Sequence, residues 1–405
     1  MREAIILGAG VIGVTSAYAL ASRGFAVTVI DAASAVAEGG ASYRNGGQLS
    51  YSYTDALASP SLVKNIPGYL LGYDPALRLK PGISPAFLDW SVRFLANAGQ
   101  GAFERNTIDA LKIGLDSRKG FEELSQKIDF NHRRPGKINL YSNYEALERA
   151  KDLSRLKNRH GAGQSILSPE EAIAKEPALA HYGHSFVGAL WSPLDEAGDS
   201  HLFCRNLQRL LERDYGVRFQ FDTKVERLRK RAGKIDAVVT QAGELPSSLV
   251  IIALGAWSAP IAKTIGVRLP IWPMQGYSMT VPAAAMAPVA SITDTSRKVV
   301  FCRIGDKLRI AGLADIGSRH SEFRQDRFKI LVEMAKGIFP KAGDYDGDLE
   351  AWTSYRPVTP TSQPIVGATR VGGLFVNSGH GSLGWTLSMA TAAKLAACVE
   401  AAHGG

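Results

Sequence analysis

The sequence predicts an α/β fold in two domains, and three features of the 405-residue chain support this prediction. A short apolar strand at the N-terminus runs directly into a glycine-rich turn and a helix. Further short strands alternate with helices and resume after long insertions, which is typical of a domain that is discontinuous in sequence. Segments of alternating polarity at residues 269–281 and 298–313 indicate an antiparallel sheet, and therefore a second domain.

The first glycine-rich turn has the order of elements that dinucleotide binding requires. After an apolar strand at residues 4–7, Gly8, Gly10 and Gly13 have the spacing G-x-G-x-x-G at the start of a helix. Gly8 allows a tight turn, Gly10 lets the backbone approach a pyrophosphate, and Gly13 lets the helix pack closely on the strand. The alternative is a turn that binds nothing, but such turns usually lack this context of strand and helix.

The residues that follow extend the same pattern. Val11 and Ile12 place backbone N–H groups at the helix N-terminus, where they favour the negative charge of phosphate groups. A second apolar strand at residues 26–30 ends in Asp31 and Ala32, where a carboxylate can accept hydrogen bonds from ribose hydroxyls. Together these features predict a Rossmann-type domain that binds a dinucleotide.

A second glycine-rich turn lies near the end of the chain, between an expected strand at residues 374–377 and a helix at 387–402. Its backbone donors and the positive end of the helix dipole favour negative charge, such as a reduced flavin carries. The residues expected to contact the flavin here are Gly379, Gly381, Ser382, Leu383 and Gly384. His380 is a weaker candidate for shaping the site, because a locally packed histidine is the ordinary alternative.

Arg356 is the candidate for binding a substrate carboxylate. It stands between Tyr355 and Pro357, shortly before the second glycine-rich turn. A guanidinium group forms two parallel hydrogen bonds to a carboxylate, which a lysine cannot do. A surface arginine is the alternative, since most arginines are exposed.

The composition argues against several classes of protein. The chain has 47 Lys and Arg against 38 Asp and Glu, a net charge of +9, but the basic residues are scattered, which disfavours nucleic-acid binding. Cys204, Cys302 and Cys398 lie far apart, so we expect a reducing compartment and no metal site. No signal peptide or convincing membrane span is expected. The interpretation is a cytoplasmic protein, with peripheral contact to the inner face of the cell membrane left open.

Over nearly its whole length the chain resembles the FAD-dependent D-amino acid oxidase superfamily, and within it the bacterial D-amino acid dehydrogenase small-subunit group. The last of the matching blocks is the most specific. The blocks are residues 8–13, 42–50, 195–199, 250–258, 273–278, 303–313, 355–367 and 377–386. The resemblance implies FAD as the cofactor, a Rossmann-type FAD-binding domain and an α+β substrate domain built on an antiparallel sheet.

The resemblance also implies roles for individual residues. The residues expected along the pyrophosphate and flavin are Ser42, Asn45, Gly46, Gly47, Gln48, Ala253, Gly255 and Trp257. Val225 is expected to pair with adenine through its backbone. Arg356 matches the position whose arginine binds the substrate carboxylate in related oxidases. Tyr53 and Tyr277 are weaker candidates for shaping the substrate pocket.

The implied reaction is oxidation of a D-amino acid to its imino acid by hydride transfer to flavin N5, with electrons passed to a quinone or another non-oxygen acceptor. Departures from the family pattern at Arg44, Ser362-Gln363 and Met389–Ala392 leave the amino acid open, and a cyclic one such as D-proline or hydroxyproline is included. An oxygen-using amino acid or sarcosine-type oxidase is the alternative enzyme. A non-catalytic FAD-binding electron-transfer subunit is the alternative from another class, and the oligomeric state is open.

The two predicted domains are interleaved along the chain. The FAD-binding domain is assigned residues 1–50, 144–180, 197–262 and 352–405, and the substrate domain residues 51–143, 181–196 and 263–351. A proline- and aromatic-rich insertion at residues 51–97 is the expected docking surface for a membrane or an electron carrier.

Overall fold

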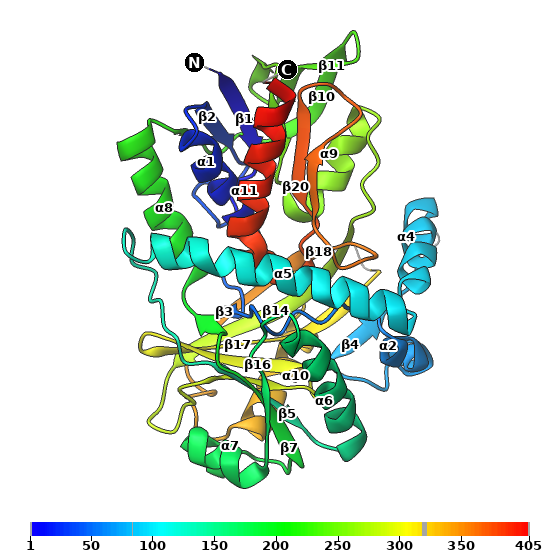
Figure 1. Cartoon of the computed structure of the whole chain (residues 1–405), viewed down its shortest axis with the longest axis vertical. Helices are drawn as coiled ribbons and strands as arrows, with labels where there is room; N and C mark the ends of the chain where they lie inside the picture. The colour runs from blue at the N-terminus through cyan, green and yellow to red at the C-terminus, as the bar shows by residue number, and fades with distance from the viewer. Residues whose placement is uncertain (1, 83, 318–321, 404–405) are drawn as a thin grey trace.

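A computed structural model describes residues 2–82, 84–317 and 322–403 of the chain. Its two main sheets lie at opposite ends of the molecule, and the long helix α5 (Gln100–Leu124) crosses between them (Figure 1). The prediction of an α/β fold with a Rossmann-type part and a second part built on a largely antiparallel sheet is confirmed.

The first sheet has six strands in the order β19-β20-β13-β1-β2-β9. They are β1 (Glu3–Leu7), β2 (Ala26–Ile30), β9 (Arg218–Gln220), β13 (Val250–Ile252), β19 (Ile365–Ala368) and β20 (Leu374–Ser378). All neighbours are parallel except β19, which runs antiparallel to β20. The strands read as short apolar runs without alternation because both faces of the sheet are covered.

Helices cover one face of this sheet and a small sheet covers the other. The helices α1 (Val11–Ala21), α8 (Ser200–Tyr215) and α11 (Gly384–His403) pack together over the first core. The second core lies beneath β10 (Val225–Arg231), β11 (Lys234–Thr240), β12 (Gly243–Pro246) and α9 (Ser258–Thr264). Short 3-10 turns, η2 (Gly255–Trp257) and η3 (Gly381–Leu383), follow β13 and β20.

The second sheet has nine strands, and eight of them follow the order β18-β14-β17-β16-β15-β5-β7-β6. They are β5 (Lys137–Tyr141), β6 (Ser165–Leu167), β7 (Gly188–Ser192), β14 (Trp272–Pro282), β15 (Ser291–Asp294), β16 (Val299–Ile304), β17 (Lys307–Ile316) and β18 (Glu350–Val358). The ninth, β4 (Leu77–Leu79), pairs in parallel with the end of β17. The pair formed by β15 and β5 is also parallel, and the other neighbours are antiparallel.

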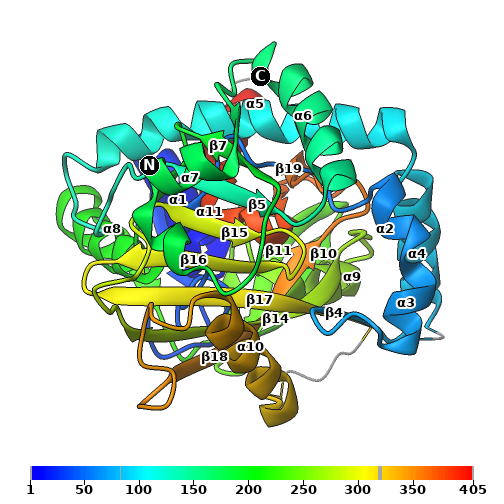
Figure 2. The ribbon, with the colours of Figure 1, turned by 90° about the horizontal axis from the view of Figure 1, so that it is seen from below.

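The two faces of the nine-stranded sheet have different surroundings. One face packs its alternate apolar residues against α10 (Gln325–Ile338), as Figure 2 shows from below. The other face points toward the six-stranded sheet and is crossed by the segment of residues 42–49. That segment ends in β3 (Gln48–Leu49), which pairs with β8 (Glu196–Ala197). We call this second face the inner face.

The remaining helices lie around the nine-stranded sheet. The helix α6 (Tyr144–Asn158), the helix α7 (Pro169–Lys175) and the turn η1 (Pro177–His181) lie near β5, β6 and β7. The helices α2 (Pro60–Lys64), α3 (Ile66–Leu71) and α4 (Pro85–Ala96) form one side of the molecule (Figure 2). Within the described residues, no helix combines the length and the apolarity that crossing a bilayer requires.

The strand pairing places two segments differently from the predicted domain assignment. Residues 144–180 were assigned to the FAD-binding domain, but β6 pairs with β7 in the nine-stranded sheet and α6 contacts β5 and β7. Residues 352–358 were also assigned there, but they belong to β18, which pairs with β14. The sequence did not show these pairings, because a helix or an isolated strand does not indicate its sheet until long-range pairing is known, and the domain boundaries stay a prediction.

Candidate functional site

Four turns that are distant in the sequence meet at one edge of the six-stranded sheet. Strand β1 pairs in parallel with β2 and β13, and β13 pairs in parallel with β20. The turns after these strands begin at Gly8, Asp31, Ala253 and Gly379. In open α/β sheets, the crevice outside the carboxyl ends of the strands is where ligands bind.

The glycines of the first turn are required by its packing. Gly8 has φ +104°, and a Cβ there would lie 2.6 Å from the carbonyl oxygen of Ala253. A Cβ on Gly13 would collide with the carbonyl oxygen of Gly8. A Cβ on Gly10 would meet only the hydroxyl of Ser42, at 3.3 Å, so the backbone on this side of the turn is open to a close approach.

Asp31 is held beside this turn by backbone donors. Its carboxylate accepts hydrogen bonds from the amides of Ala9, at 2.6 Å, and Ala33, at 2.8 Å. The amide of Thr223 donates to the backbone carbonyl of Asp31, at 2.8 Å, and this contact brings the start of β10 at Val225 alongside. The acid and Val225 thus lie at the same end of the crevice, as expected for residues along an adenosine group.

The segment of residues 42–48 joins the crevice to the inner face of the nine-stranded sheet. Its predicted contact residues are Ser42, Asn45, Gly46, Gly47 and Gln48. The amide of Val11 donates to Ser42 Oγ, at 3.0 Å. Arg309 donates to the carbonyl of Asn45, at 2.9 Å, and Lys137 donates to Gln48 Oε1, at 2.8 Å.

Two left-handed glycines, one in the turn after β13 and one in the second glycine-rich turn, have open space beside them. Gly255, in η2, and Gly381, in η3, both have φ +55°, and a Cβ on either would meet nothing within 4 Å. Gly379 is more tightly packed, because its Cβ would lie 2.6 Å from Thr359. Trp257 is 58% exposed at this edge. The buried ring nitrogen of Trp385, at the start of α11, has no hydrogen-bond partner.

These features fit the FAD that the resemblance implies. The open backbone beside Gly10 suits a pyrophosphate, and the space beside Gly255 and Gly381 suits a flat ring system. The residues predicted to hold the cofactor therefore converge on one edge, although their individual contacts stay predictions. In the ranges that the structure describes, no group of three or more His, Cys, Asp or Glu side chains is arranged to hold a metal ion.

Arg356 projects from β18 into a space kept free by a glycine. Its Nη1 donates to the carbonyl oxygen of Leu313, at 3.0 Å. A Cβ on Gly276, in the adjacent strand β14, would lie 2.5 Å from Cζ of the guanidinium. Burial alone lowers the pKa of Arg356 to about 10, so the side chain stays positively charged at neutral pH. Among the described residues, no carboxylate forms an ion pair with it.

Arg356 lies only two residues before a contact with the edge where the cofactor turns meet. Val358, at the end of β18, forms an antiparallel bridge with His380 in the second glycine-rich turn. Strand β18 also contacts η2 and η3. A carboxylate bound to the guanidinium would therefore lie beside the open edge of the six-stranded sheet.

The three weaker candidates are not gathered around Arg356. Tyr277 lies on the α10 face of β14, in the core of that face, with its ring edge-on to Phe323. His380 is buried beneath its turn, where Nε2 lies 3.1 Å from Thr391 Oγ1, and burial lowers its pKa to about 3. This histidine is neutral at physiological pH. The ring of Tyr53 lies beside Lys137, the first residue of β5, and burial raises the pKa of its hydroxyl.

Two buried charges beside Tyr53 were missed by the sequence analysis. Lys137 is 2% exposed, and its Nζ lies 4.3 Å from the ring centre of Tyr53; desolvation lowers its pKa to about 8. Asp195 is 1% exposed and accepts a hydrogen bond from the amide of Ser52, at 2.7 Å; desolvation raises its pKa to about 6. The sequence did contain one indication of the buried Lys137, because this lysine is the first residue of an otherwise apolar strand at residues 137–141.

Leu313 and Gly276 were also not identified as parts of the site. Gly276 lies within one of the blocks that carry the family resemblance. Why a glycine is needed there became clear only from the pairing of β14 with β18, which places the guanidinium of Arg356 where a side chain would lie. Leu313 has φ +60°, and nothing in its residue type indicates such a conformation.

Comparisons with known proteins show the family of the chain. The profile of the family described as FAD dependent oxidoreductase matches residues 3–398. A D-amino acid dehydrogenase of Methylobacterium sp. (strain 4-46) is 36% identical over 98% of this chain and 95% of its own length. Another, of Vibrio vulnificus (strain YJ016), is 33% identical over 95% of this chain and 93% of its own.

Solved structures show the same fold at lower identity. The glycine oxidase of Geobacillus kaustophilus has a TM-score of 0.78 at 20% identity, covering 99% of this chain and 95% of its own. The L-proline dehydrogenase of P.horikoshii has a TM-score of 0.73 at 18% identity, covering 98% of this chain and 93% of its own.

The space beside Gly276 can be tested with a single methyl group. In Gly276→Ala the Cβ would displace the guanidinium of Arg356, so we expect the Kd for benzoate to rise about tenfold or more while FAD content is unchanged. The measurement is a titration of the visible flavin spectrum. Gly101→Ala, at a helix position with nothing within 4 Å, is the matched control. Equal benzoate affinity in the two variants would contradict the assigned space.

The charge of Asp195 makes a pH-dependent contribution to stability. Its pKa is raised from the ordinary 3.8 to about 6, so between these values the folded state holds a proton that the unfolded chain has released. Stability from this group therefore falls as the pH rises from about 4 to 6. We expect the Tm of the wild type to fall relative to that of Asp195→Asn over this range. A constant difference in Tm between the two proteins would argue against it.

Proposed function

Because the chain belongs to the FAD dependent oxidoreductase family, we propose that it is an FAD-dependent D-amino acid dehydrogenase. The observation that carries the proposal is the charged guanidinium of Arg356, which forms no ion pair with a carboxylate of the described residues, beside the edge where the cofactor turns meet. The names of relatives at 33% to 37% identity give the chirality and the dehydrogenase type of the proposed reaction.

The chain's contribution to the reaction is mainly one of orientation. Arg356 binds the substrate carboxylate through two parallel hydrogen bonds, while the carbonyl of Leu313 fixes the plane of the guanidinium from behind. When bound, FAD supplies a group that accepts a hydride from the α carbon. The amino group loses a proton, and the imino acid product hydrolyses to a 2-oxo acid and ammonia unless it is cyclic.

None of the three weaker candidates among the described residues is suited to act as a general base. His380 is neutral but turned into the packing beneath its turn, where Thr391 is its partner. Tyr277 lies on the opposite face of the sheet, and the hydroxyl of Tyr53 has a raised pKa. The reaction therefore depends on placing the α hydrogen correctly, which a carboxylate clamp provides.

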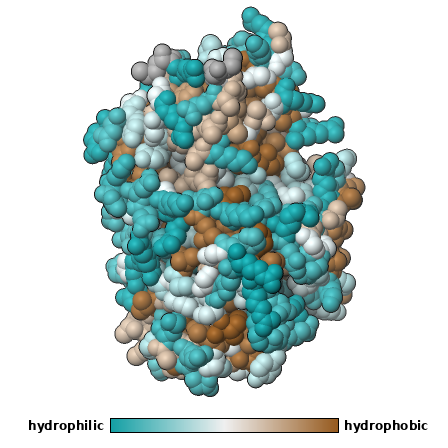
Figure 3. Space-filling model, viewed as in Figure 1, coloured by the Kyte–Doolittle hydropathy of each residue, from teal (hydrophilic) through white to brown (hydrophobic). Residues whose placement is uncertain are grey.

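The proposal for the electron acceptor is based on an exposed apolar ridge. This ridge lies on the side of the molecule formed by α2, α3 and α4. The ridge consists of Val63, Leu70, Leu71, Tyr73, Leu88, Val92 and Leu95. Leu71, Tyr73 and Val92 are the most exposed, at 66%, 78% and 67%. In the view of Figure 3, apolar surface is visible along α4 at the right-hand edge. Exposed apolar surface of this extent is typical of a contact with a membrane or a partner.

The ridge is built on a rigid base close to Arg356. The opposite side of α4 packs Phe87, Trp90 and Phe94 against Trp272 and its neighbours. The ring nitrogen of Trp90 donates to the carbonyl of Val358, at 2.9 Å. We commit to an anionic lipid surface as the occupant, because the basic net charge and the exposed Lys64 and Lys80 complement one. A membrane quinone is then the proposed electron acceptor.

An anaerobic screen tests the proposed reaction. D-amino acids, cyclic D-imino acids and N-methyl amino acids are mixed with the purified yellow protein, and loss of the flavin absorption is followed. Bleaching by a D-amino or D-imino acid supports the proposal, and no bleaching by any compound would favour a non-catalytic FAD-binding subunit. Peroxide yield in air, compared with the rate on a quinone, separates a dehydrogenase from an oxidase.

Removing the guanidinium should weaken substrate binding without removing the cofactor. For Arg356→Leu we expect the KM of the substrate found in the screen to rise roughly 100-fold, since two charged hydrogen bonds are lost. FAD content and the flavin spectrum should be unchanged. Arg105→Leu, at an exposed position of α5, is the matched control. An unchanged KM in Arg356→Leu would refute the role of this arginine.

The ridge is tested by sedimentation with lipid vesicles. We expect the wild type to bind vesicles of phosphatidylethanolamine and phosphatidylglycerol, and Leu71→Ser/Val92→Ser to bind about tenfold more weakly, because apolar side chains no longer enter the lipid. Met286→Ser/Val289→Ser removes two exposed apolar residues elsewhere and should bind as the wild type does. Equal binding of both double variants would exclude the ridge as the contact.

A further inference from the structure

A β-bulge in β17 lies directly behind Arg356. Gln275 pairs with Asp315 and Tyr277 pairs with Gly312, so Leu313 and Ala314 together oppose the single residue between them in β14. Leu313 has φ +60°, a conformation that is unfavourable for a bulky residue and costs free energy. Such strain persists only where the surrounding structure holds it in place.

The bulge has a direct consequence for the guanidinium. The carbonyl oxygen of Leu313 accepts a hydrogen bond from Nη1 of Arg356, at 3.0 Å. This is the hydrogen bond that the structure gives for the Arg356 side chain within the described residues. The backbone conformation of Leu313 therefore sets the direction in which the guanidinium presents its other donors.

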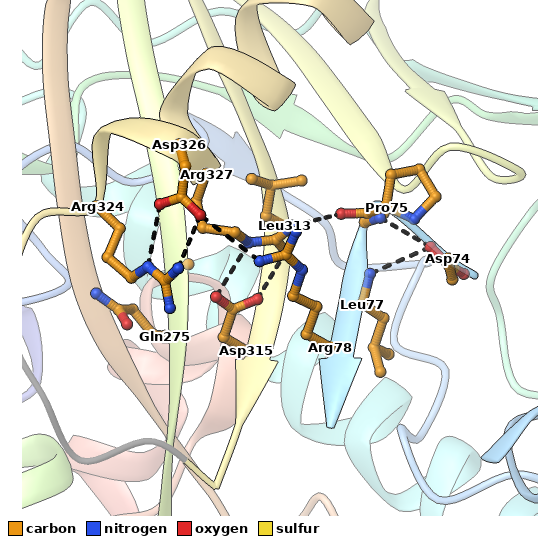
Figure 4. A network of polar contacts seen from close by, with 12 residues as sticks. Asp74, Pro75, Leu77, Arg78, Gln275, Leu313, Asp315, Arg324, Asp326 and Arg327 are labelled. Atoms are coloured by element: carbon orange, nitrogen blue, oxygen red, sulfur yellow. Dashed lines mark hydrogen bonds and ion pairs between the residues drawn. The ribbon is translucent and has the colours of Figure 1, made fainter. Parts of the chain in front are cut away.

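A buried ion pair holds the next part of the bulge from the opposite face of the sheet. Arg327, on α10, is fully buried and donates from Nε to Asp315 Oδ2, at 3.0 Å, and from Nη2 to Oδ1, at 2.6 Å. Its remaining Nη1 donates to the carbonyl of Pro75, at 2.6 Å. Figure 4 shows Arg327 between Asp315 and Pro75, with Leu313 beside them.

The strand β4 completes the clamp on the bulge. The amide of Ala314 donates to the carbonyl of Ala76, at 2.7 Å, and β4 continues the pairing to Ile316. Strand β17 pairs with β16 before the bulge and with β4 after it. Because Arg327 binds both Asp315 and the chain entering β4, one side chain fixes the place where the strand changes partner.

We propose that Arg327 and Asp315 are positioning residues that hold the bulge so that Leu313 orients Arg356 for a carboxylate. The inference rests on the proposed function, since it takes Arg356 as the carboxylate-binding residue. Neither residue of the pair can touch a substrate, because both lie on the α10 face and Arg356 lies on the inner face. A buried ion pair is frequently no more stabilising than an apolar pair of similar size. Replacing this pair by apolar residues can therefore change the geometry of the bulge while the protein stays folded.

The test compares carboxylate binding with stability in one set of variants. Arg327→Met/Asp315→Leu replaces the pair by apolar residues, and Asp315→Asn removes the charge with little change of shape. For each folded variant, the Kd of benzoate is measured by titrating the flavin spectrum, and the KM and kcat of the substrate found in the screen are measured with Tm and FAD content. We expect both Kd and KM to rise about tenfold, kcat to change less, and FAD content to be unchanged.

The controls separate positioning from general loss of structure. Lys336→Gln/Asp346→Asn removes an exposed ion pair made by the same helix, away from β4 and the bulge, and should leave the Kd of benzoate unchanged. Arg327→Lys keeps the charge and should lose less affinity than Arg327→Met/Asp315→Leu. If the double apolar variant does not fold, Asp315→Asn decides the question. Wild-type Kd and KM in a folded variant that lacks the pair would overturn the inference.

The outcome for Arg356→Leu keeps this test distinct from that of the proposed function. If Arg356→Leu leaves the Kd of benzoate unchanged, the carboxylate-binding role itself fails. If that variant loses affinity while Arg327→Met/Asp315→Leu does not, the carboxylate-binding role stands and the positioning role of the pair fails.

Discussion

The parallel register of β1, β2, β13 and β20 is the constraint on which the rest of the site depends. Parallel strands in register end at the same edge, so turns that are hundreds of residues apart become neighbours. Gly8 and Gly13 maintain this edge because a side chain at either position would meet a backbone oxygen. Strand β18 reaches the same edge through the bridge between Val358 and His380, which gives Arg356 a fixed place relative to the cofactor turns.

Positive charge on the inner face is the second organising feature. Arg309 and Lys137 are buried there and Arg356 is half-buried, and within the described ranges none of them has a carboxylate at ion-pair distance. Neutral oxygens partly compensate each charge, such as the carbonyl of Leu313 for Arg356 and that of Asn45 for Arg309. Cations buried in this way favour anionic ligands, which agrees with a carboxylate substrate and a phosphate-containing cofactor.

The proposed chemistry requires no general base from the candidate side chains His380, Tyr277 and Tyr53. None of these described candidates combines the pKa and the position of a general base, so the proposed part of the chain in the reaction is orientation by one charged side chain. The direction of that side chain depends on a strained backbone carbonyl at Leu313. The ion pair between Arg327 and Asp315 connects this carbonyl to α10 and β4, so residues without access to the substrate influence its binding.

The sequence by itself determined the local elements of this protein. Strand, glycine turn, helix and acid follow one another between residues 4 and 31, and each depends on neighbours in the chain, so the Rossmann-type part was predicted correctly. Family resemblance added FAD as the cofactor and supported Arg356, which its place in the sequence had already singled out. Only the tertiary structure decided which face Tyr277 occupies, to which sheet residues 144–180 belong, and that Leu313 adopts a left-handed conformation. These properties arise from pairing between strands far apart in the sequence, and no local pattern of residues records that pairing.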